Sequence, residues 1–168
     1  QDPEEWYEKA LLAIRELSLD ISPEEVEAIG FSGQMHGLVL LDEKDEVIRP
    51  AILWNDGRST KETDYLNQDV GEDFLLRHTG NIAFPGFTAP KLLWVARNEP
   101  EHFSRIGKIL LPKDYVAFRL SGQFATDVSD AAGTLYFDTA KRCWSEPMLS
   151  LLHIRESQLP KVYESNEC

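Results

Sequence analysis

The sequence has little cysteine, no long apolar run and no cluster of positive charge. Only Cys143 and Cys168 occur in 168 residues, and neither belongs to a group with zinc-site spacing. Two cysteines are too few for a disulfide framework, so we expect ordinary thiols in a reducing cytoplasm. No apolar stretch reaches the ~18 residues that a membrane-spanning helix needs. We also see no secretory leader, so we expect no membrane contact.

Positive charge is scarce. Lys and Arg total 17 against 29 Asp and Glu, which gives a formal net charge of −12 at pH 7. Nucleic acids and anionic lipids attract basic patches, so we expect neither as a partner. With 42% hydrophobic and 27% charged residues, the composition is that of one globular domain rather than a disordered chain.

Motifs for binding nucleotide phosphates are absent as well. The sequence contains neither G-x-x-x-x-G-K-[ST] nor G-x-G-x-x-G, and it lacks the HRD and DFG motifs of protein kinases. Residues 30–34 (GFSGQ) differ from the hydrolase motif G-x-S-x-G because Gln34 replaces its last glycine. We therefore expect no hydrolase nucleophile and no nucleotide phosphate site in this chain.

Helical periodicity dominates, with a few short strands near the start. Asp2 and Pro3 supply an N-cap and a first-turn proline for a helix over residues 4–17. Short apolar runs predict strands at residues 26–31, 38–41, 47–48 and 51–54. Further helices are predicted over residues 59–68, 71–78, 90–98, 99–106, 110–121 and 145–152, and a loop leading into an edge strand over residues 126–138. The pattern predicts an α/β fold with few strands for a self-sufficient sheet.

A turn between two glycines, residues 33–37 (GQMHG), follows the first predicted strand. Open α/β sheets bind ligands at such strand ends. The amide of Gln34 and the imidazole of His36 can exchange hydrogen bonds with the hydroxyl groups of a polyol. The alternative is structural, with Met35 in the core and His36 closing the turn, and the residues alone leave both interpretations open.

A second candidate lies at residues 54–58 (WNDGR). The indole of Trp54 can stack on a sugar, while Asp56 and Arg58 supply directional hydrogen bonds. In the alternative, Trp54 belongs to the core and Asp56 pairs with Arg58 at the surface. The Gly/Pro-rich residues 84–91 form either a loop that closes over a ligand or a stiff connector.

Other charged residues have structural explanations. Lys113 and Asp114 are adjacent, and a buried ion pair or a helix cap explains them better than catalysis does. Asp127 and Asp130 lack a third ligand, so we expect no metal site.

Taken together, these segments resemble the FGGY family of carbohydrate kinases. The resemblance is collinear over nearly the whole chain and rests on DPEEWYEKAL, IGFSGQMHGLVLLD, RPAILWNDGRS, HTGNIAFPGFTAPKLLWVARNEPEHF, ILLPKDYVAFRLSG and ATDVSDAAGTLYFD. Residues 86–98 fit the first signature of the family, with Lys91 and Trp94 at its fixed positions. Within the family, MHG and LWNDGR resemble the members that phosphorylate D-xylulose, whereas glycerol kinases carry charged residues in place of Met35 and His36.

The resemblance implies a ribonuclease H-like fold of the actin and hexokinase type, in which sugar and ATP meet between two domains. Residues 1–168 would be a single partial domain, the sugar side of the N-terminal domain. It would lack the family's first phosphate-binding hairpin and the C-terminal domain with the catalytic Asp. ATP and Mg²⁺ would serve the intact kinase, so no catalytic, cofactor-binding or metal-binding residue is expected here.

The resemblance also implies a ketose-binding wall, formed by Met35, His36, Gln34, Trp54, Asp56 and Arg58. The expected function is part of an ATP-dependent kinase that converts D-xylulose to D-xylulose 5-phosphate, the isolated chain being inactive. Two alternatives stay open: another kinase of the family, acting on L-ribulose or gluconate, and a non-catalytic sugar-binding or interaction fragment. Missing strands would leave a sheet edge exposed, so a homodimer or self-association of the fragment is expected.

Overall fold

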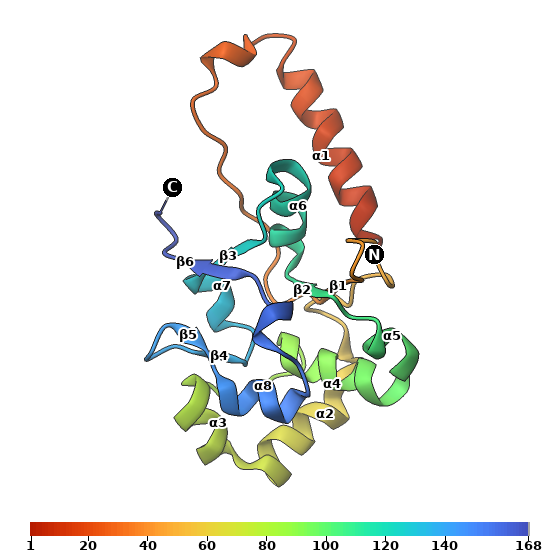
Figure 1. Cartoon of the computed structure of the whole chain (residues 1–168), viewed down its shortest axis with the longest axis vertical. Coiled ribbons are helices and arrows are strands. Elements are labelled where there is room, and N and C mark those ends of the chain that lie inside the picture. The colour runs from red at the N-terminus through yellow and green to blue at the C-terminus, as the bar shows by residue number, and fades with distance from the viewer. Residues whose placement is uncertain (168) are drawn as a thin grey trace.

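Short strands are interspersed among α-helices along residues 1–167, the part of the chain that the computed structural model describes (Figure 1). The helices are α1 (Pro3–Leu17), α2 (Thr60–Asp64), α3 (Glu72–Thr79), α4 (Thr88–Asn98), α5 (Pro100–Ser104), α6 (Pro112–Ser121), α7 (Val128–Ala132) and α8 (Glu146–Leu152). The strands are β1 (Val39–Leu41), β2 (Lys108–Leu110), β3 (Ala125–Asp127), β4 (Phe137–Asp138), β5 (Cys143–Trp144) and β6 (Lys161–Tyr163). Cys168 lies outside the described residues, and the predicted mixed α/β fold is confirmed.

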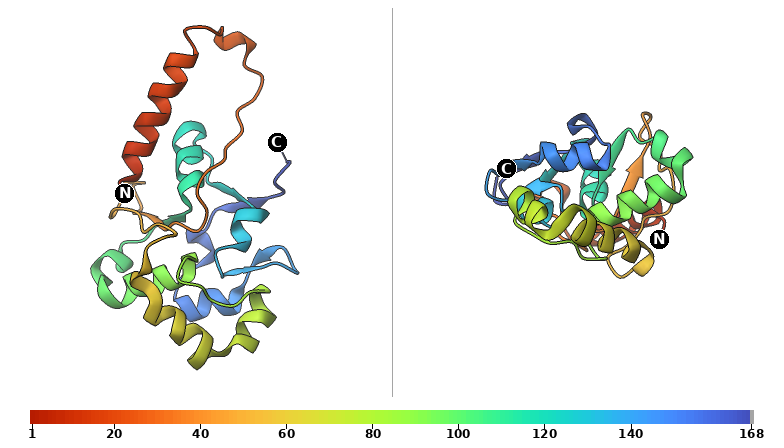
Figure 2. Two further views of the ribbon diagram at one scale, coloured as in Figure 1. Left: turned by 180° about the vertical axis from the view of Figure 1, so that it is seen from behind. Right: turned by 90° about the horizontal axis from the view of Figure 1, so that it is seen from below.

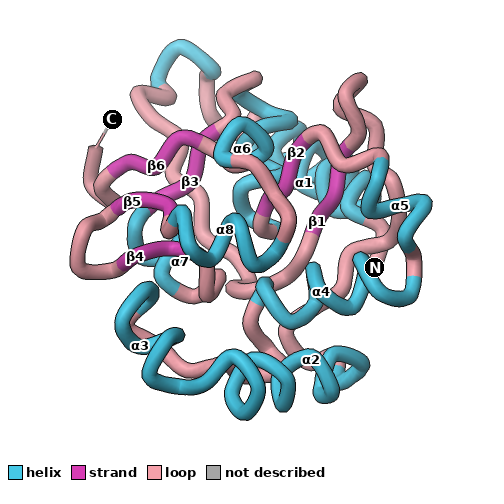
Figure 3. The backbone as a smooth tube through the Cα atoms, turned by 60° about the horizontal axis from the view of Figure 1, so that its bottom comes forward, coloured by secondary structure: helices cyan, strands magenta, loops and turns pink. Residues whose placement is uncertain are grey.

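The described strands form three separate pairs rather than one sheet (Figure 3). β1 pairs antiparallel with β2, β3 pairs parallel with β6, and β4 pairs antiparallel with β5. Within the first pair, Leu40 lies opposite Ile109 and both enter the main core. Their neighbours Val39 and Leu110 enter a second core with Tyr115. The apolar run at residues 38–41 is therefore continuous because both of its faces are buried.

The predicted helices are largely confirmed because their signals are local. The Asp2 carboxylate accepts a hydrogen bond from the Glu4 amide at 3.0 Å and caps α1. The helix predicted at residues 59–68 is α2 followed by a π-helical turn, Tyr65–Gly71, that leads into α3. The helix predicted from residue 110 begins only at Pro112, because Leu110 belongs to β2.

Three predicted strands are wrong. Residues 26–31 are extended but pair with no strand among residues 1–167, and Val26 and Ile29 are 53% and 62% exposed. An apolar pattern forms a strand only where a partner covers it, and here none does. Residues 47–48 and 51–54 contribute single bridges to Leu41 and Leu38, because Pro50 between them has no N–H for a ladder.

The predicted loop over residues 126–138 contains a helix, α7. Its Gly, Ala, Ser and Asp content is typical of a loop, but the Asp127 carboxylate accepts a hydrogen bond from the Ser129 amide at 3.0 Å and caps the helix. The predicted edge strand follows as β4.

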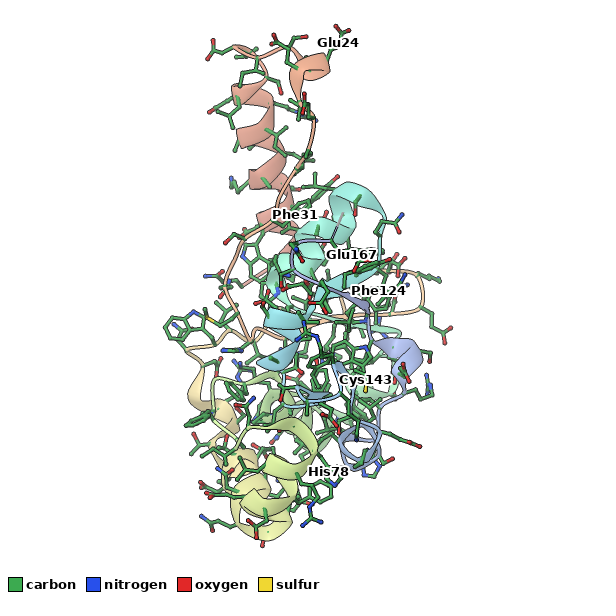
Figure 4. The ribbon with its side chains drawn as sticks, turned by 90° about the vertical axis from the view of Figure 1, so that its left-hand side faces the viewer. Glu24, Phe31, His78, Phe124, Cys143 and Glu167 are labelled. Carbon is green, nitrogen blue, oxygen red and sulfur yellow. The ribbon has the colours of Figure 1, made fainter. Side chains whose placement is uncertain are left out.

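One segment projects from the rest of the molecule (Figure 2). We call residues 12–31 the N-terminal arm; Glu24 lies near its far end (Figure 4). The start of α1 is fixed on α6, where Glu4 pairs with Arg119 and accepts a hydrogen bond from the Tyr115 hydroxyl at 2.6 Å. Beyond this contact the arm exposes apolar side chains, namely Leu12, Ile14, Leu17, Leu19, Ile21, Val26, Ile29 and Phe31. No helix within residues 1–167 combines the length and apolar character needed to cross a membrane.

Candidate functional site

The turn at residues 33–37 carries a histidine in a rare backbone conformation. His36 has φ +64°, a left-handed value that costs a non-glycine residue about 1–3 kcal/mol unless its surroundings favour it. Gly37 lets the chain pass close to Pro112, where a Cβ atom would overlap the proline ring. The turn is therefore held by its contacts with other parts of the fold.

Two side chains of α4 hold the backbone of His36. Its carbonyl oxygen accepts hydrogen bonds from the Lys91 ammonium at 2.9 Å and from the Thr88 hydroxyl at 3.2 Å. The Lys91 ammonium also donates to the carbonyl of Gly86, in the loop before α4. This connects three segments: the turn at residues 33–37, the loop at residues 84–87 and the first turn of α4.

The imidazole of His36 is held on two sides. Its ring centroid lies 4.8 Å from that of Phe87, and a Cβ atom at Gly133 would overlap the ring. Nδ1 is buried without a hydrogen-bond partner among the described residues. Burial and the nearby charge of Lys91 lower the pKa of His36 below its ordinary value of 6.5, so the imidazole is neutral at pH 7.

Lys91 is the residue that sequence reasoning missed. The sequence marks Lys91 only as a position of the family signature. Its side chain is fully buried, and no carboxylate within residues 1–167 forms an ion pair with it. Burial lowers the pKa of Lys91 to about 7, with the charge of Asp56 opposing this shift. The signal in the sequence was helical periodicity, since Lys91 shares the buried face of α4 with Thr88, Leu92 and Val95.

The residues predicted at 54–58 lie beside this site, and two of them pair with each other. The Asp56 carboxylate accepts a hydrogen bond from Arg58 Nε at 2.9 Å, and this contact lowers the pKa of Asp56. The Arg58 guanidinium also lies 4.8 Å from the ring centroid of Trp94. The structure thus contains the predicted Asp56–Arg58 pair.

Trp54 and Met35 are not core residues. They are 52% and 46% exposed, so the structural alternatives that placed them in the core are wrong. The carbonyl of Trp54 packs against Gly86, where a Cβ atom would lie 3.1 Å from the oxygen. The same loop therefore contacts Trp54, His36 and Lys91.

Asp56 and Gln34 line two separate cavities that do not include His36. The first, of about 490 Å³, is lined by Arg49, Asn55, Asp56 and Arg58 among others. Gln34 lines the second, of about 160 Å³, together with Phe31, Gly33 and Lys113. Neither of these two cavities brings the six predicted residues together.

A second lysine, half-buried, has carboxylate partners. Lys113 Nζ lies 2.9 Å from Asp114, 2.7 Å from Asp127 and 3.0 Å from Asp130. Burial raises the pKa of Asp114 to about 6, although Lys113 acts in the opposite direction. The structural explanation of the Lys113–Asp114 pair is confirmed, and within residues 1–167 no three potential ligands are grouped to hold a metal ion.

Comparison with known proteins identifies relatives of this arrangement. The family model for the N-terminal domain of the FGGY family of carbohydrate kinases matches residues 1–168. The chain is 50% identical over 167 residues to the xylulose kinase of Escherichia coli (strain K12), covering 99% of this chain and 34% of that protein. The chain thus spans about a third of the length of the curated relatives that it matches.

Two solved structures have the same fold. The "xyloylose kinase" of Brucella ovis superposes with a TM-score of 0.92 at 48% identity, covering 98% of this chain and 34% of that one. The gluconate kinase of Lactobacillus acidophilus superposes with a TM-score of 0.91 at 31% identity, covering 97% of this chain and 33% of that one.

Lys91 makes stability depend on pH above neutrality. Between its folded pKa of about 7 and its ordinary 10.5, the unfolded chain binds more protons than the folded chain. The contribution of Lys91 to the free energy of unfolding therefore rises with pH across this range. We expect the free energy of unfolding of the wild type, minus that of Lys91→Met, to become more positive as the pH rises from about 6.5 to about 9.5. Urea denaturation measures both values. A constant difference would contradict the depressed pKa.

Gly133→Ala is expected to displace the His36 imidazole, because the new Cβ would overlap ring atoms Cε1 and Nδ1. Overpacking of this kind costs about 1–3 kcal/mol. Gly30→Ala is the control, since a Cβ there meets nothing within 4 Å. Imidazole ¹⁵N spectra should shift for His36 in the first variant and not in the second. Unchanged His36 signals in Gly133→Ala would refute the packing described above.

Proposed function

Because the chain belongs to the FGGY family of carbohydrate kinases, we propose that it forms the sugar-binding part of a longer ATP-dependent kinase that converts D-xylulose to D-xylulose 5-phosphate. Its similarity to xylulose kinases supports this substrate. A second candidate is a kinase for a related sugar acid, favoured by the similarity to a gluconate kinase.

The observation that carries the proposal is the neutral imidazole of His36, fixed beside exposed apolar side chains. A neutral imidazole has one donor and one acceptor nitrogen, which suits hydroxyl groups of a ketose. The exposed surfaces of Met35 and Trp54 suit its C–H faces. We propose that Asp56 and Arg58, from the cavity that they line, and Gln34, from a separate one, support the ligand less directly.

This chain is proposed to orient the sugar rather than to bind nucleotide or metal. Lys113 is the half-buried cation beside Gln34, but three carboxylates already surround it, and their charge repels phosphate. We therefore assign ATP, Mg²⁺ and the catalytic base to other parts of the kinase. The contribution of this chain is to hold one hydroxyl of the ketose in position for phosphoryl transfer.

We further propose that residues 1–168 are the sugar side of a ribonuclease H-like domain. The extended residues 26–31 pair with no strand within residues 1–167 and expose apolar side chains, as a strand does when its sheet is incomplete. A phosphate-binding hairpin pairing with this segment would complete the sheet.

In the full-length kinase, His36→Ala is expected to raise the KM for D-xylulose by about threefold to tenfold, the value of one hydrogen bond, and to leave the KM for ATP unchanged. ADP production with D-xylulose, L-ribulose and D-gluconate measures both constants. His78→Ala is the control, since His78 lies in α3, away from residues 33–37. Equal rises in both KM values would refute the assignment, and a highest kcat/KM for gluconate would favour the second candidate.

The N-terminal arm is expected to make the isolated chain self-associate. Leu19 and Ile29 are 85% and 62% exposed, and apolar surface of this kind drives association. Sedimentation velocity should show a mass that grows with concentration, and Leu19→Lys with Ile29→Lys should reduce this growth. Leu76→Lys, at an exposed site on α3, should not. A monomer at every concentration would disprove the association.

A further inference from the structure

We propose that Lys91 is a positioning residue of the sugar site: its ammonium holds the carbonyls of His36 and Gly86 together and so fixes the His36 imidazole for contact with the ligand. This inference rests on the proposed function, which assigns His36 to the sugar. It adds a residue that does not touch the ligand itself.

The geometry places one nitrogen between two loops that are far apart in sequence. The carbonyl of His36 lies 2.9 Å from Lys91 Nζ, and the carbonyl of Gly86 accepts a second bond from the same atom. The loop at residues 84–87 is closed by a hydrogen bond from the Phe87 amide to the Phe84 carbonyl at 2.9 Å. Since the Phe87 ring contacts the imidazole, Lys91 fixes both the backbone of His36 and the surface against which its ring packs.

Packing alone does not explain why a lysine rather than an apolar residue occupies position 91. The neighbours of Lys91 on the buried face of α4 include Leu92 and Val95, and an apolar side chain would fill the same space. Burying an ammonium is unfavourable unless it is paired. Lys113 meets this condition with three carboxylates, whereas the hydrogen-bond acceptors of Lys91 among the described residues are the two carbonyls alone.

The backbone of His36 makes this support necessary. At φ +64° the residue is outside its preferred region, and the hydrogen bonds to its carbonyl favour the observed conformation. Thr88 supplies one of these bonds at 3.2 Å, but it does not reach the loop at residues 84–87. Among the hydrogen bonds described for residues 1–167, those of Lys91 are the ones that join the two segments, in addition to the packing of Phe87 on the imidazole.

Two charged groups face the imidazole. Lys91 lowers the pKa of His36, and Asp130, in the helix α7 that precedes Gly133, raises it. Replacing Lys91 with methionine removes the first influence and leaves the second. The titration of His36 therefore responds to the charge of Lys91 as well as to burial of the ring, and the backbone coupling of His36 reports its conformation separately.

The first experiment is NMR on this chain, comparing wild type, Lys91→Met and Lys108→Met. Lys108 is the control because it lies at the start of β2 and pairs with Asp45, a residue outside the two loops. We expect Lys91→Met to raise the titration midpoint of His36 and to change its backbone ³J(HN–Hα) coupling, with both unchanged in Lys108→Met. A folded Lys91→Met chain with an unchanged His36 would overturn the proposal. If Lys91→Met does not fold, Lys91→Arg takes its place, because a guanidinium is too large for the position of the ammonium between the two carbonyls. An unchanged His36 coupling in Lys91→Arg would overturn the proposal equally.

The second experiment measures kinetics of the full-length kinase. Lys91→Met should raise the KM for D-xylulose by about threefold to tenfold, leave the KM for ATP unchanged, and add nothing to His36→Ala in the double variant. If Lys91→Met shifts the His36 signals but His36→Ala leaves the sugar KM unchanged, the proposed function fails and the positioning by Lys91 stands. If His36→Ala raises the sugar KM and Lys91→Met changes neither signals nor KM, Lys91 has no positioning role and the proposed function stands.

Discussion

The β1–β2 pair has no exposed face, and the rest of the structure depends on this constraint. Leu38 and Leu40 enter one hydrophobic core while Val39 and Leu41 enter another, so a slip of one residue would exchange every side chain between the two cores. The two cores differ in shape and in their partners, which makes the register specific. Residues 33–37 come immediately before β1, so the constraint also fixes where the candidate site begins.

The turn at residues 33–37 and the N-terminal arm differ in how many tertiary contacts fix their conformation. The turn at residues 33–37 has the buried strand on one side and the side chains of α4 across from it, and its histidine is kept in a left-handed conformation. The residues just before it are extended, apolar and exposed. Within a few residues the chain thus passes from an exposed segment with few tertiary contacts to a turn whose conformation is fixed by tertiary contacts.

The sequence predicted the features that depend on neighbouring residues. Asp2 and Pro3 define the start of α1 through contacts within one helical turn, and the glycines around MHG predict its turn, although the strand predicted before it is wrong. The errors concern pairing. Residues 26–31 have a strand pattern but no strand partner within residues 1–167. The hydrogen bond from Lys91 to His36 joins residues 55 positions apart, which no local pattern contains. The pair of Asp56 and Arg58 was one of two interpretations, and the choice required their actual contact.

The two lysines Lys91 and Lys113 show how charge is distributed around the proposed site. Lys113, surrounded by three carboxylates, has a raised pKa and remains charged at pH 7, whereas Lys91, with carbonyl acceptors only, has a pKa near 7. His36 is neutral at this pH, and the charge of Arg58 is compensated by Asp56. The described part of the site therefore offers hydrogen bonds and apolar surface but no free cation for a carboxylate. This balance agrees with the uncharged ketose proposed above, because binding gluconate would require a compensating charge that these residues do not provide.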